Sequence, residues 1–538
     1  MALAISSGRG KAIQLQPVSH IAFVVRDAAD SANVLLVRSI AAADLEPGDS
    51  EIWDLPCFDL PRLGKRQQLR GSIDHPQLVC SVEAALREAG VRNFAIEEAI
   101  EKVQALVPTP LHFVSLWKIV REPDFGPRAP IQTVVLIVEA PRYVSSLGSC
   151  EWFDRQRALE LLVNETRDAE RVGVLAASFF YPSFPKGTCS DLNLECFYQE
   201  YPPGVLVIPM LSRTLKPFCK TNLVISAPTS SRFLDADVNI NDSTFTGQAL
   251  IVDPGCSVPA YNELVAIVRL LPKKLFVFLT HHHLDHTEGL PAVKQANSGA
   301  IVIAHEKTLK RIGPALYGIK YVSVTGGTKL LISGQRFEII AAPGHTDGHL
   351  CLFHLETRTL VAGDHCVGEG SSIVDGNSGG NLHDYMNTSH RLLELAPKVV
   401  VPMHGRPNLL PLQLLKGYIK HRQSREATIL KAIEAGATSA FAIVSSAYKQ
   451  TNILLWPAAL INVKVHVDHL QRQQKLPQGF PVEKFKRSCG LAFKVRWFAR
   501  FIGSYAFQRN AWRLLLCLVA IFFVWYKWGQ GSGEEEEW

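Results

Sequence analysis

One short stretch constrains this chain more than any other. Residues 280–290 read T-H-H-H-L-D-H-T-E-G-L, so four of the chain's 18 histidines lie between His281 and His286, together with Asp285. The stretch follows the apolar run L-F-V-F-L, which is typical of a core strand. Burying an imidazole or a carboxylate without a partner costs free energy, so a cluster this dense requires either water or a metal ion. A solvated polar loop is the plainer alternative.

The spacing inside this stretch favours a metal-binding loop. His281 and His283 share one side of an extended segment, whereas Asp285 and His286 follow a turn and offer a carboxylate and an imidazole in another direction. One such loop can serve two neighbouring cations. Nitrogen and carboxylate donors at this density suit zinc, with iron or manganese as alternatives.

Further candidate ligands lie where apolar strands end. His345 lies in P-G-H-T-D-G-H, Asp364 follows T-L-V-A-G, and His404 follows V-V-V-P-M. Ligands in layered α/β proteins often occupy such positions. Each motif is weak alone, but together they predict a site for two metal ions. His349 and His365 have no clear ligand role, and we interpret each as a packed or solvated histidine.

The order of elements predicts two sheets with helices outside them. From residue 205 onward, short apolar strands alternate with helices, one of which is expected over Tyr261–Leu271. Strands are expected in V-L-V-I-P, T-N-L-V-I, A-L-I-V-D, I-V-I-A, F-E-I-I-A, H-L-C-L-F and T-L-V-A-G. Residues Arg425–Leu476 are predicted to be mostly helical.

In these motifs the chain resembles the metallo-β-lactamase superfamily, whose H-x-H-x-D-H signature, later histidine, G-D pair and final histidine occur here in that order. The resemblance implies an α/β fold, an αββα sandwich over residues 200–428. It also implies that Asp253, in V-D-P-G, orients the metal loop without binding metal. His282 is interpreted as a non-ligand. The implied ligands are His281, His283 and His345 for the first metal, Asp285, His286 and His404 for the second, and Asp364 as the bridge between them.

The implied chemistry is hydrolysis by a hydroxide that bridges two Zn²⁺ ions, with Fe or Mn as alternatives, and with Asp285 as the catalytic residue that orients the nucleophile. G-E-G-S-S at residues 368–372, D-Y-M-N-T-S at 384–389 and Y-I-K-H-R-Q-S-R-E at 418–426 resemble the β-lactamase-like protein 2 family. That family implies an endoribonuclease acting on single-stranded RNA, with a small helical winged-helix-like domain, here over residues 429–480. His421 and Arg422 are candidate substrate contacts. Whether the winged-helix-like domain contacts RNA or only packs against the catalytic domain is left open.

Three alternatives to a ribonuclease stay open. A glyoxalase II-like thioesterase would use the same P-G-H-T-D-G-H motif on a small thioester, and the persulfide dioxygenases share much of the motif set. A membrane-tethered, non-catalytic metal-binding adaptor is the third. The complete ligand set argues against it, because losing one ligand is the simplest way for an unused site to decay. Only 40 residues separate Asp364 from His404, which leaves no room for the large inserted domain of one nucleic-acid-cleaving branch.

Residues 15–185 resemble a Nudix hydrolase domain through W-D-L-P at 53–56 and A-A-L-R-E-A-G-V at 84–91. Nudix chemistry needs clustered glutamates to hold magnesium. Here the paired glutamate positions are held by Val91 and Arg92 in one register and by Arg87 and Glu88 in the other. This Nudix-like domain is therefore predicted to have lost catalysis. An unrelated α+β domain is the alternative.

The C-terminal end combines positive charge with an apolar run. Eight Lys/Arg and no acid occur from Lys484 to Arg513, and Leu514–Tyr526 carries no charge. We predict a basic juxtamembrane segment over 484–510 and a transmembrane tail anchor over 512–528, with an in-plane amphipathic anchor or a buried helix as alternatives. Eleven scattered cysteines fit reduced thiols. These features predict an intracellular, membrane-associated protein, with a mitochondrion or another organelle left open; the oligomeric state is not predicted.

Overall fold

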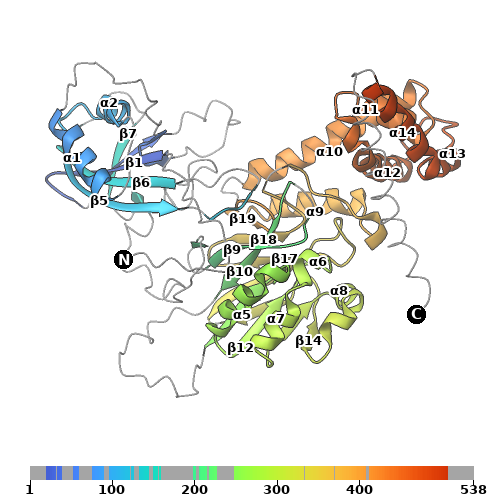
Figure 1. Cartoon of the computed structure of the whole chain (residues 1–538), viewed down its shortest axis with the longest axis horizontal. Coiled ribbons are helices and arrows are strands. Elements are labelled where there is room, and N and C mark those ends of the chain that lie inside the picture. Colours follow the sequence, from blue (N-terminus) through green and yellow to red (C-terminus); the bar gives the residue numbers. More distant parts are fainter. Residues whose placement is uncertain are drawn as a thin grey trace. The chain divides into compact units, whose positions relative to one another are not determined.

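The computed structural model describes residues 20–31, 33–38, 53–59, 76–89, 96–121, 123–126, 132–143, 150–154, 157–158, 198–200, 205–214, 217–226, 247–332, 334–368, 370–407 and 411–506. The chain divides into two compact units, one of Met1–Ser372 with Thr388–Lys416 and one of Ile373–Asn387 with Gly417–Trp538. The first unit contains an N-terminal sheet and a two-sheet sandwich, and the second is helical (Figure 1).

The N-terminal sheet is built around β1 (His20–Asp27) and β6 (Gln132–Ala140), which pair in parallel. Its strand order is β3-β2-β1-β6-β5, with β4 on β1 and β7 on β2. Two helices, α1 (Pro76–Glu88) and α2 (Glu97–Leu106), share its apolar core. The apolar runs within residues 20–27 and 132–140 thus form the two central strands of this sheet. The remaining strands are β2 (Asn33–Arg38), β3 (Trp53–Asp54), β4 (Cys57–Asp59), β5 (His112–Arg121) and β7 (Cys150–Asp154).

The sandwich consists of a seven-stranded sheet, in the order β14-β13-β12-β11-β10-β9-β8, and a five-stranded sheet, in the order β15-β16-β17-β18-β19. β11 and β12 pair in parallel, as do β18 and β19. The seven apolar runs predicted as strands are present, as is the strand predicted in L-F-V-F-L, which is β12. The first sheet comprises β8 (Gln199–Glu200), β9 (Val205–Leu211), β10 (Lys220–Ser226), β11 (Gln248–Val252), β12 (Lys274–Phe278), β13 (Ile301–Ala304) and β14 (Lys320–Ser323); the second comprises β15 (Lys329–Ile332), β16 (Gln335–Ala341), β17 (Leu350–His354), β18 (Thr359–Gly363) and β19 (Val399–Pro402).

Alternate side chains of each central strand enter different cores, which explains why these strands are apolar throughout. In β11, Leu250 and Val252 face the core between the sheets, whereas Ala249 and Ile251 face the helices. β17 repeats this pattern, because Leu352 faces the inner core and Phe353 an outer one. Side chains of α5 (Tyr261–Arg269) and α7 (Leu290–Ala296) share the helix-side core of the first sheet. The outer core of the second sheet includes residues of α9 (Leu382–Glu394) and α10 (Pro411–Glu434). This is the predicted helix–sheet–sheet–helix layering.

The second unit is a small helical domain. α11 (Ala440–Ala447), α12 (Trp456–Arg472), α13 (Val482–Ser488) and α14 (Leu491–Ala506) share one apolar core with the end of α10. Residues 411–506, which are all described, contain no strand and therefore no β-wing. Residues 484–506 of the predicted juxtamembrane segment form most of α13, a short turn and α14, and contribute Phe485 and Phe493 to this core.

No helix in the described part of the chain is both long and apolar enough to cross a bilayer. The predicted tail anchor, residues 512–528, lies outside the described residues.

Candidate metal centre

The histidine-rich stretch begins where β12 ends and turns into a short helix. His283 has an extended backbone and immediately precedes α6 (Leu284–Thr287), and the His286 N–H donates to the His283 carbonyl at 3.0 Å. The sequence therefore folds locally as its spacing predicts, with an extended H-x-H segment followed by one helical turn.

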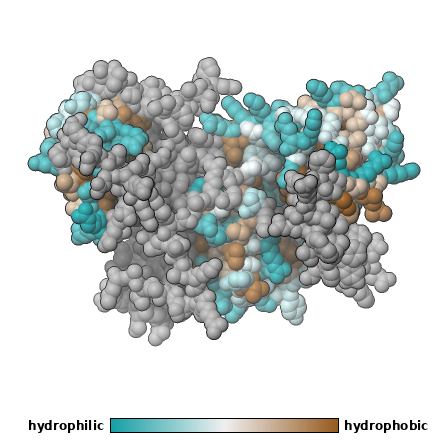
Figure 2. Space-filling model, turned by 45° about the horizontal axis from the view of Figure 1, so that its top comes forward, coloured by the Kyte–Doolittle hydropathy of each residue, from teal (hydrophilic) through white to brown (hydrophobic). Residues whose placement is uncertain are grey.

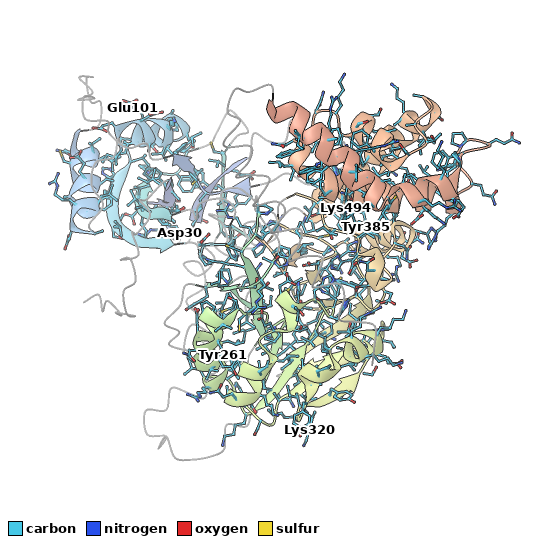
Figure 3. The ribbon with its side chains drawn as sticks, turned by 45° about the vertical axis from the view of Figure 1, so that its right-hand side comes forward. Asp30, Glu101, Tyr261, Lys320, Tyr385 and Lys494 are labelled. Atoms are coloured by element: carbon cyan, nitrogen blue, oxygen red, sulfur yellow. The ribbon has the colours of Figure 1, made fainter. Side chains whose placement is uncertain are left out.

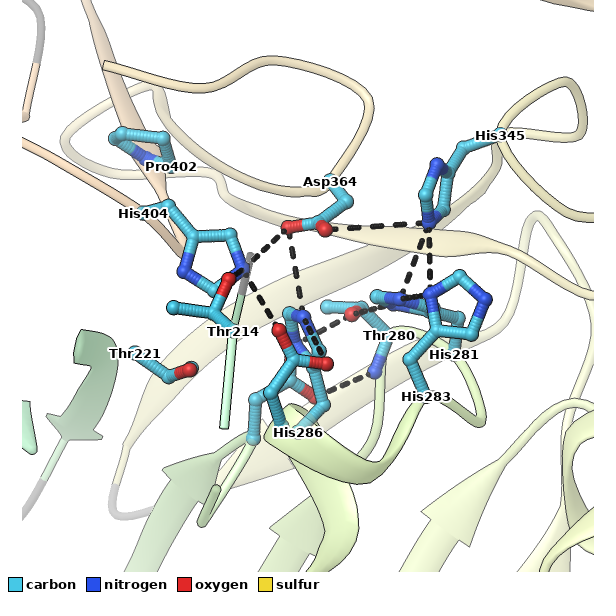
Figure 4. Close-up of polar contacts among 12 residues, drawn as sticks. Thr214, Thr221, Thr280, His281, His283, His286, His345, Asp364, Pro402 and His404 are labelled. Carbon is cyan, nitrogen blue, oxygen red and sulfur yellow. Dashed lines mark hydrogen bonds and ion pairs between the residues drawn. The ribbon is translucent and has the colours of Figure 1, made fainter. Parts of the chain in front are cut away.

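Three imidazole nitrogens converge in a first cluster (Figure 4). His281 Nε2 lies 2.9 Å from His283 Nδ1, and His345 Nε2 lies 3.2 Å from each of these two atoms. Tetrahedral zinc–nitrogen bonds of about 2.1 Å would place ligand nitrogens about 3.4 Å apart. The observed separations are within about 0.5 Å of that spacing.

A second cluster contains Asp285, His286 and His404. His404 Nε2 lies 3.3 Å from Asp285 Oδ2, and His286 Nε2 lies 3.8 Å from Asp285 Oδ1. The second cluster therefore has a carboxylate of its own, Asp285. The first cluster has three imidazoles, and its oxygen donor comes from Asp364.

Asp364 lies between the two clusters. Its Oδ1 is 3.4 Å from His404 Nε2 and 3.5 Å from His286 Nε2, while its Oδ2 is 3.9 Å from His345 Nε2 (Figure 4). One carboxylate therefore presents a different oxygen to each cluster. The structure thus brings together all seven residues predicted as metal ligands.

Asp253 and Thr280 connect the two clusters from behind. Asp253, at the end of β11, accepts hydrogen bonds from the Thr280 N–H at 2.8 Å and the Thr280 hydroxyl at 2.6 Å, and its Oδ2 is 2.9 Å from His286 Nδ1. Because the Thr280 hydroxyl donates to Asp253, it accepts from His281 Nδ1, 3.0 Å away. Both histidines are thereby held with Nδ1 protonated and Nε2 facing the centre. Sequence analysis predicted the role of Asp253 but did not single out Thr280.

His404 is positioned by the start of β10. Its Nδ1 donates to the Lys220 carbonyl at 2.8 Å, so Nε2 faces the cluster. The buried amide of Asn222 donates to the carbonyls of Pro402 and Gly405, which flank His404 on either side, at 2.8 and 2.7 Å. The Phe218 ring packs against the imidazole at 5.7 Å between centroids. These contacts were missed from the sequence, because nothing in K-T-N-L-V-I indicates a partner in a distant loop.

The other histidines of the motifs do not join the clusters. Buried His349 accepts a hydrogen bond through Nε2 from the Asp364 N–H at 3.1 Å, so it positions the bridging residue. Buried His365 contacts Ser389 Oγ at 3.0 Å through Nε2. His282 is half-buried, and its ring packs beside that of His283. His349 and His365 are thus packed histidines, as the sequence analysis interpreted them.

The two candidate substrate contacts lie on α10 in the second unit. His421 is exposed, whereas Arg422 is buried, with Nη1 donating to Asn462 at 3.2 Å and the guanidinium 5.0 Å from the Tyr385 ring centre. A buried arginine engaged in this way would have to repack to reach a substrate. Neither residue belongs to the two clusters.

The two clusters differ electrostatically. Burial lowers the pKa of His281 well below its usual value, and its histidine neighbours act in the same direction. Burial would also lower the pKa of His404, but Asp364 and Asp285 outweigh it and raise that pKa to about 10. The pKa of Asp285 is about 2, because His286 and His404 together outweigh the effect of burial. Asp285 is therefore ionised at neutral pH.

The donor set fits divalent metal ions. His286 Nε2 and Asp364 Oδ1 are buried, and neither makes a hydrogen bond within the described part of the chain. Buried polar atoms are almost always satisfied by protein, water or a bound ion. Three lone-pair nitrogens on one side and mixed nitrogen and carboxylate donors on the other match the ligand preferences of zinc, iron or manganese.

Backbone packing fixes the second cluster as well. A Cβ atom added to Gly255 would lie 1.5 Å from the Asp285 carbonyl oxygen. The glycine of V-D-P-G is therefore required for close approach of two backbones. Asp253 itself adopts a left-handed conformation, with φ of 48°, which its three accepted hydrogen bonds help to maintain.

Comparison with known proteins agrees with this geometry. The family model described as metallo-beta-lactamase superfamily matches residues 244–404, which include every residue of both clusters. A β-lactamase-like protein 2 homologue of Drosophila melanogaster is 29% identical over 208 residues, covering 37% of this chain and 69% of the relative. The Caenorhabditis elegans homologue is 28% identical over 191 residues, covering 35% of this chain and 62% of the relative.

Among solved structures, a β-lactamase domain protein from Burkholderia ambifaria is 19% identical, with a TM-score of 0.44, covering 54% of this chain and 91% of that chain. The chain spans somewhat more than two thirds of the fly relative and somewhat less than two thirds of the worm relative. Residues 244–404, which surround the clusters, thus match the metallo-beta-lactamase superfamily, and the chain is similar to the β-lactamase-like protein 2 homologues.

Proposed function

We propose that this chain is a binuclear metal-dependent hydrolase whose preferred substrate is single-stranded RNA. The observation that carries the hydrolase proposal is the position of Asp364, whose two oxygens face two separate donor clusters. A single-metal site would not need a carboxylate in that position. The RNA substrate rests on the resemblance of the 368–372, 384–389 and 418–426 motifs to the β-lactamase-like protein 2 family.

Each cluster would hold one divalent ion. His281, His283 and His345 would bind the first, Asp285, His286 and His404 the second, and Asp364 would bridge them. Zinc is the ion we propose, with iron or manganese as alternatives. Two such ions would supply a water nucleophile at neutral pH and would polarise the oxygen of the substrate that is attacked.

Asp285 is proposed as the catalytic residue of the chain itself. Its side chain is 16% exposed, whereas that of His286 is fully buried. The flanking histidines keep it ionised, because the Asp285 pKa is about 2. An ionised carboxylate at the accessible side of the second cluster can accept a hydrogen bond from an attacking water and orient it.

The proposal is tested with two substrates and two variants. Purified chain should cleave a short single-stranded RNA, a chelator should abolish cleavage, and His283→Ala should remove activity and part of the bound metal. The matched control is His282→Ala, because His282 neighbours the same residues but is not among the proposed ligands. Elemental analysis should find two transition-metal ions per chain.

Other outcomes would select among the alternatives. Hydrolysis of S-lactoylglutathione without RNA cleavage would indicate the glyoxalase II-like thioesterase. Metal binding without turnover of either substrate would indicate the adaptor. RNA cleavage that survives His283→Ala would contradict the assignment of the metal centre.

The finer assignments outside the metal centre are also proposals. The N-terminal domain is proposed to be Nudix-like and without catalysis, which is compatible with its mixed sheet and with α1, the helix that carries A-A-L-R-E. The helical domain is proposed to correspond to the winged-helix-like domain of the family. Membrane association through residues 512–528, in a mitochondrion or another organelle, remains a prediction.

A further inference from the structure

Helix α14 buries one face in the core of the helical domain. Phe493 and Phe501, two turns apart, are 1% and 6% exposed. Between them Trp497 packs against the same core, and its indole N–H donates to the Ile453 carbonyl at 2.8 Å. The 493–497–501 stripe therefore fixes the rotation of α14 about its axis.

The outward face of α14 is apolar. Leu491 and Val495, one turn apart, are 68% and 59% exposed. We call these two residues the apolar stripe. Large aliphatic side chains gathered at a surface usually mark an interaction site.

Cations flank the apolar stripe on α14. At 100° per residue, Lys494 lies on one side of the Leu491–Val495 line and Arg496 on the other, whereas Arg500 lies on the face opposite Leu491. All three are exposed, and α14 contains no acidic residue. Figure 3 labels Lys494 on this helix, and Figure 2 shows hydrophobic residues reaching the surface of the second unit among hydrophilic ones.

The preceding helix, α13, has the same sign of charge. Lys484, Lys486 and Arg487 are exposed, and the acid of α13, Glu483, lies 3.8 Å from Lys486 Nζ. The nearby part of α12 contributes Lys464 and Asp468, which are also exposed. The surface therefore has a strong excess of positive charge around an apolar centre.

We propose that this surface binds an anionic lipid bilayer, with α14 lying in the plane of the interface. An apolar stripe with Lys494 on one side and Arg496 on the other matches that environment, because the aliphatic side chains enter the acyl boundary while the cations meet lipid phosphates. The continuation of the chain favours the same partner, since only residues 507–513 separate α14 from the uncharged run Leu514–Tyr526. RNA would use the cations but would leave Leu491 and Val495 in water. The inference does not depend on the activity of the metal centre.

The test uses the full chain and vesicles of two compositions, phosphatidylcholine alone and phosphatidylcholine mixed with phosphatidylserine, an anionic lipid of the cytoplasmic leaflet. Leu491→Gln with Val495→Gln should weaken partitioning onto the anionic vesicles by about tenfold, because two exposed aliphatic side chains no longer enter the interface. Leu331→Gln with Val322→Gln is the matched control, since both residues are similarly exposed apolar side chains in the first unit. All four positions are at the surface, so unchanged thermal unfolding checks that folding is intact.

A second measurement separates α14 from the apolar tail. Hydrogen exchange of residues 491–506 should slow when anionic vesicles are added, and replacing Lys494, Arg496 and Arg500 by Ala should remove the preference for the anionic vesicles. Equal partitioning of wild type and the Leu491/Val495 variant, with unchanged exchange in α14, would overturn the proposal and assign binding to the tail alone. Loss of oligouridylate binding in the triple-Ala variant with vesicle binding unchanged would also overturn it, in favour of RNA.

Discussion

Two sets of buried histidines in this chain have different surroundings. In the metal-binding domain, His281, His286 and His345 direct ring nitrogens at one another and at Asp364. In the helical domain, His466 and His469 are also buried, but both face one carboxylate, with Nδ1 atoms 3.6 and 2.5 Å from Glu426 Oε2. His469 also contacts Gln473 through its other nitrogen, at 3.0 Å.

The difference shows that burial next to a carboxylate does not by itself indicate a metal site. Glu426 is one carboxylate shared by two histidines, with its Oε2 2.5 Å from His469 Nδ1 and 3.6 Å from His466 Nδ1. In the metal centre, unsatisfied atoms of two different residues meet, since His286 Nε2 and Asp364 Oδ1 lie 3.5 Å apart and both lack a hydrogen bond; in the helical domain both ring nitrogens of His466 also lack one, but His466 faces a single carboxylate. Convergence of unsatisfied donors, rather than burial, is the signature of a site that needs an ion.

The largest expected effect comes from removing the shared carboxylate. Asp364→Ala should abolish binding of both metal ions and lower hydrolysis by more than about 100-fold, because even residues that only orient ligands cost 10–100-fold. Elemental analysis and RNA cleavage measure the two effects. Asp347→Ala is the control, since Asp347 lies in the His345 loop but pairs with Arg311 and Lys307. Loss of only one metal ion in Asp364→Ala would disprove bridging.

Metal removal should affect one histidine set and leave the other unchanged. An ion at 100 times its dissociation constant stabilises a folded domain by about 2.7 kcal/mol. Treatment with a chelator should therefore speed hydrogen exchange in β12 and β18, whose ends carry the ligands, but not in α12, which carries His466 and His469. Equal destabilisation of both regions would contradict a site confined to the first unit.

Variants of the two residues that orient the histidines should affect the metal affinities of the two clusters differently. Asp253→Asn should weaken the binding of both metal ions by about 10–100-fold, because Asp253 orients His286 directly and His281 through Thr280. Thr280→Val should weaken mainly the binding of the ion held by His281, His283 and His345, since the contact between His286 and Asp253 is kept. Competition with a chromogenic chelator measures the two affinities. Identical losses in the two variants would show that Thr280 does not transmit the orientation to His281.

The smallest effect is expected in the helical domain and depends on pH. Burial would raise the Glu426 pKa, but His466 and His469 outweigh it and lower that pKa from 4.5 to about 2. The stabilisation, about 1–3 kcal/mol, is therefore complete above pH 4.5 and is lost as the pH falls from 4.5 towards 2. Burial lowers the His466 pKa, so its protonation below pH 6.5 also favours unfolding.

Glu426→Gln should consequently lower the free energy of unfolding at pH 7 and flatten its decrease between pH 5 and pH 3.5. Urea denaturation at several pH values, with hydrogen exchange in α10 to α12, measures this. Glu434→Gln, an exposed position on the same helix, should leave the pH profile unchanged. A Glu426→Gln profile parallel to that of wild type would show that the ion pair does not contribute.

The exposed apolar face of α14 illustrates a limit of the sequence. Residues 484–510 were predicted from charge alone, as a basic juxtamembrane segment. The helical phase that buries Phe493, Trp497 and Phe501, and so exposes Leu491 and Val495, depends on the core contributed by α11 and α12. A sequence pattern with apolar residues on two sides of one helix does not indicate which side is buried.

The sequence by itself determined which donors the metal centre contains and in which order the strands deliver them. Both follow from local patterns: the spacing from His281 to His286, and apolar runs that end at His345, Asp364 and His404. Only the tertiary structure decided which nitrogen of each histidine faces the centre. That choice depends on acceptors far along the chain, such as the Lys220 carbonyl 184 residues before His404 and Asp253 33 residues before His286, which local spacing does not encode.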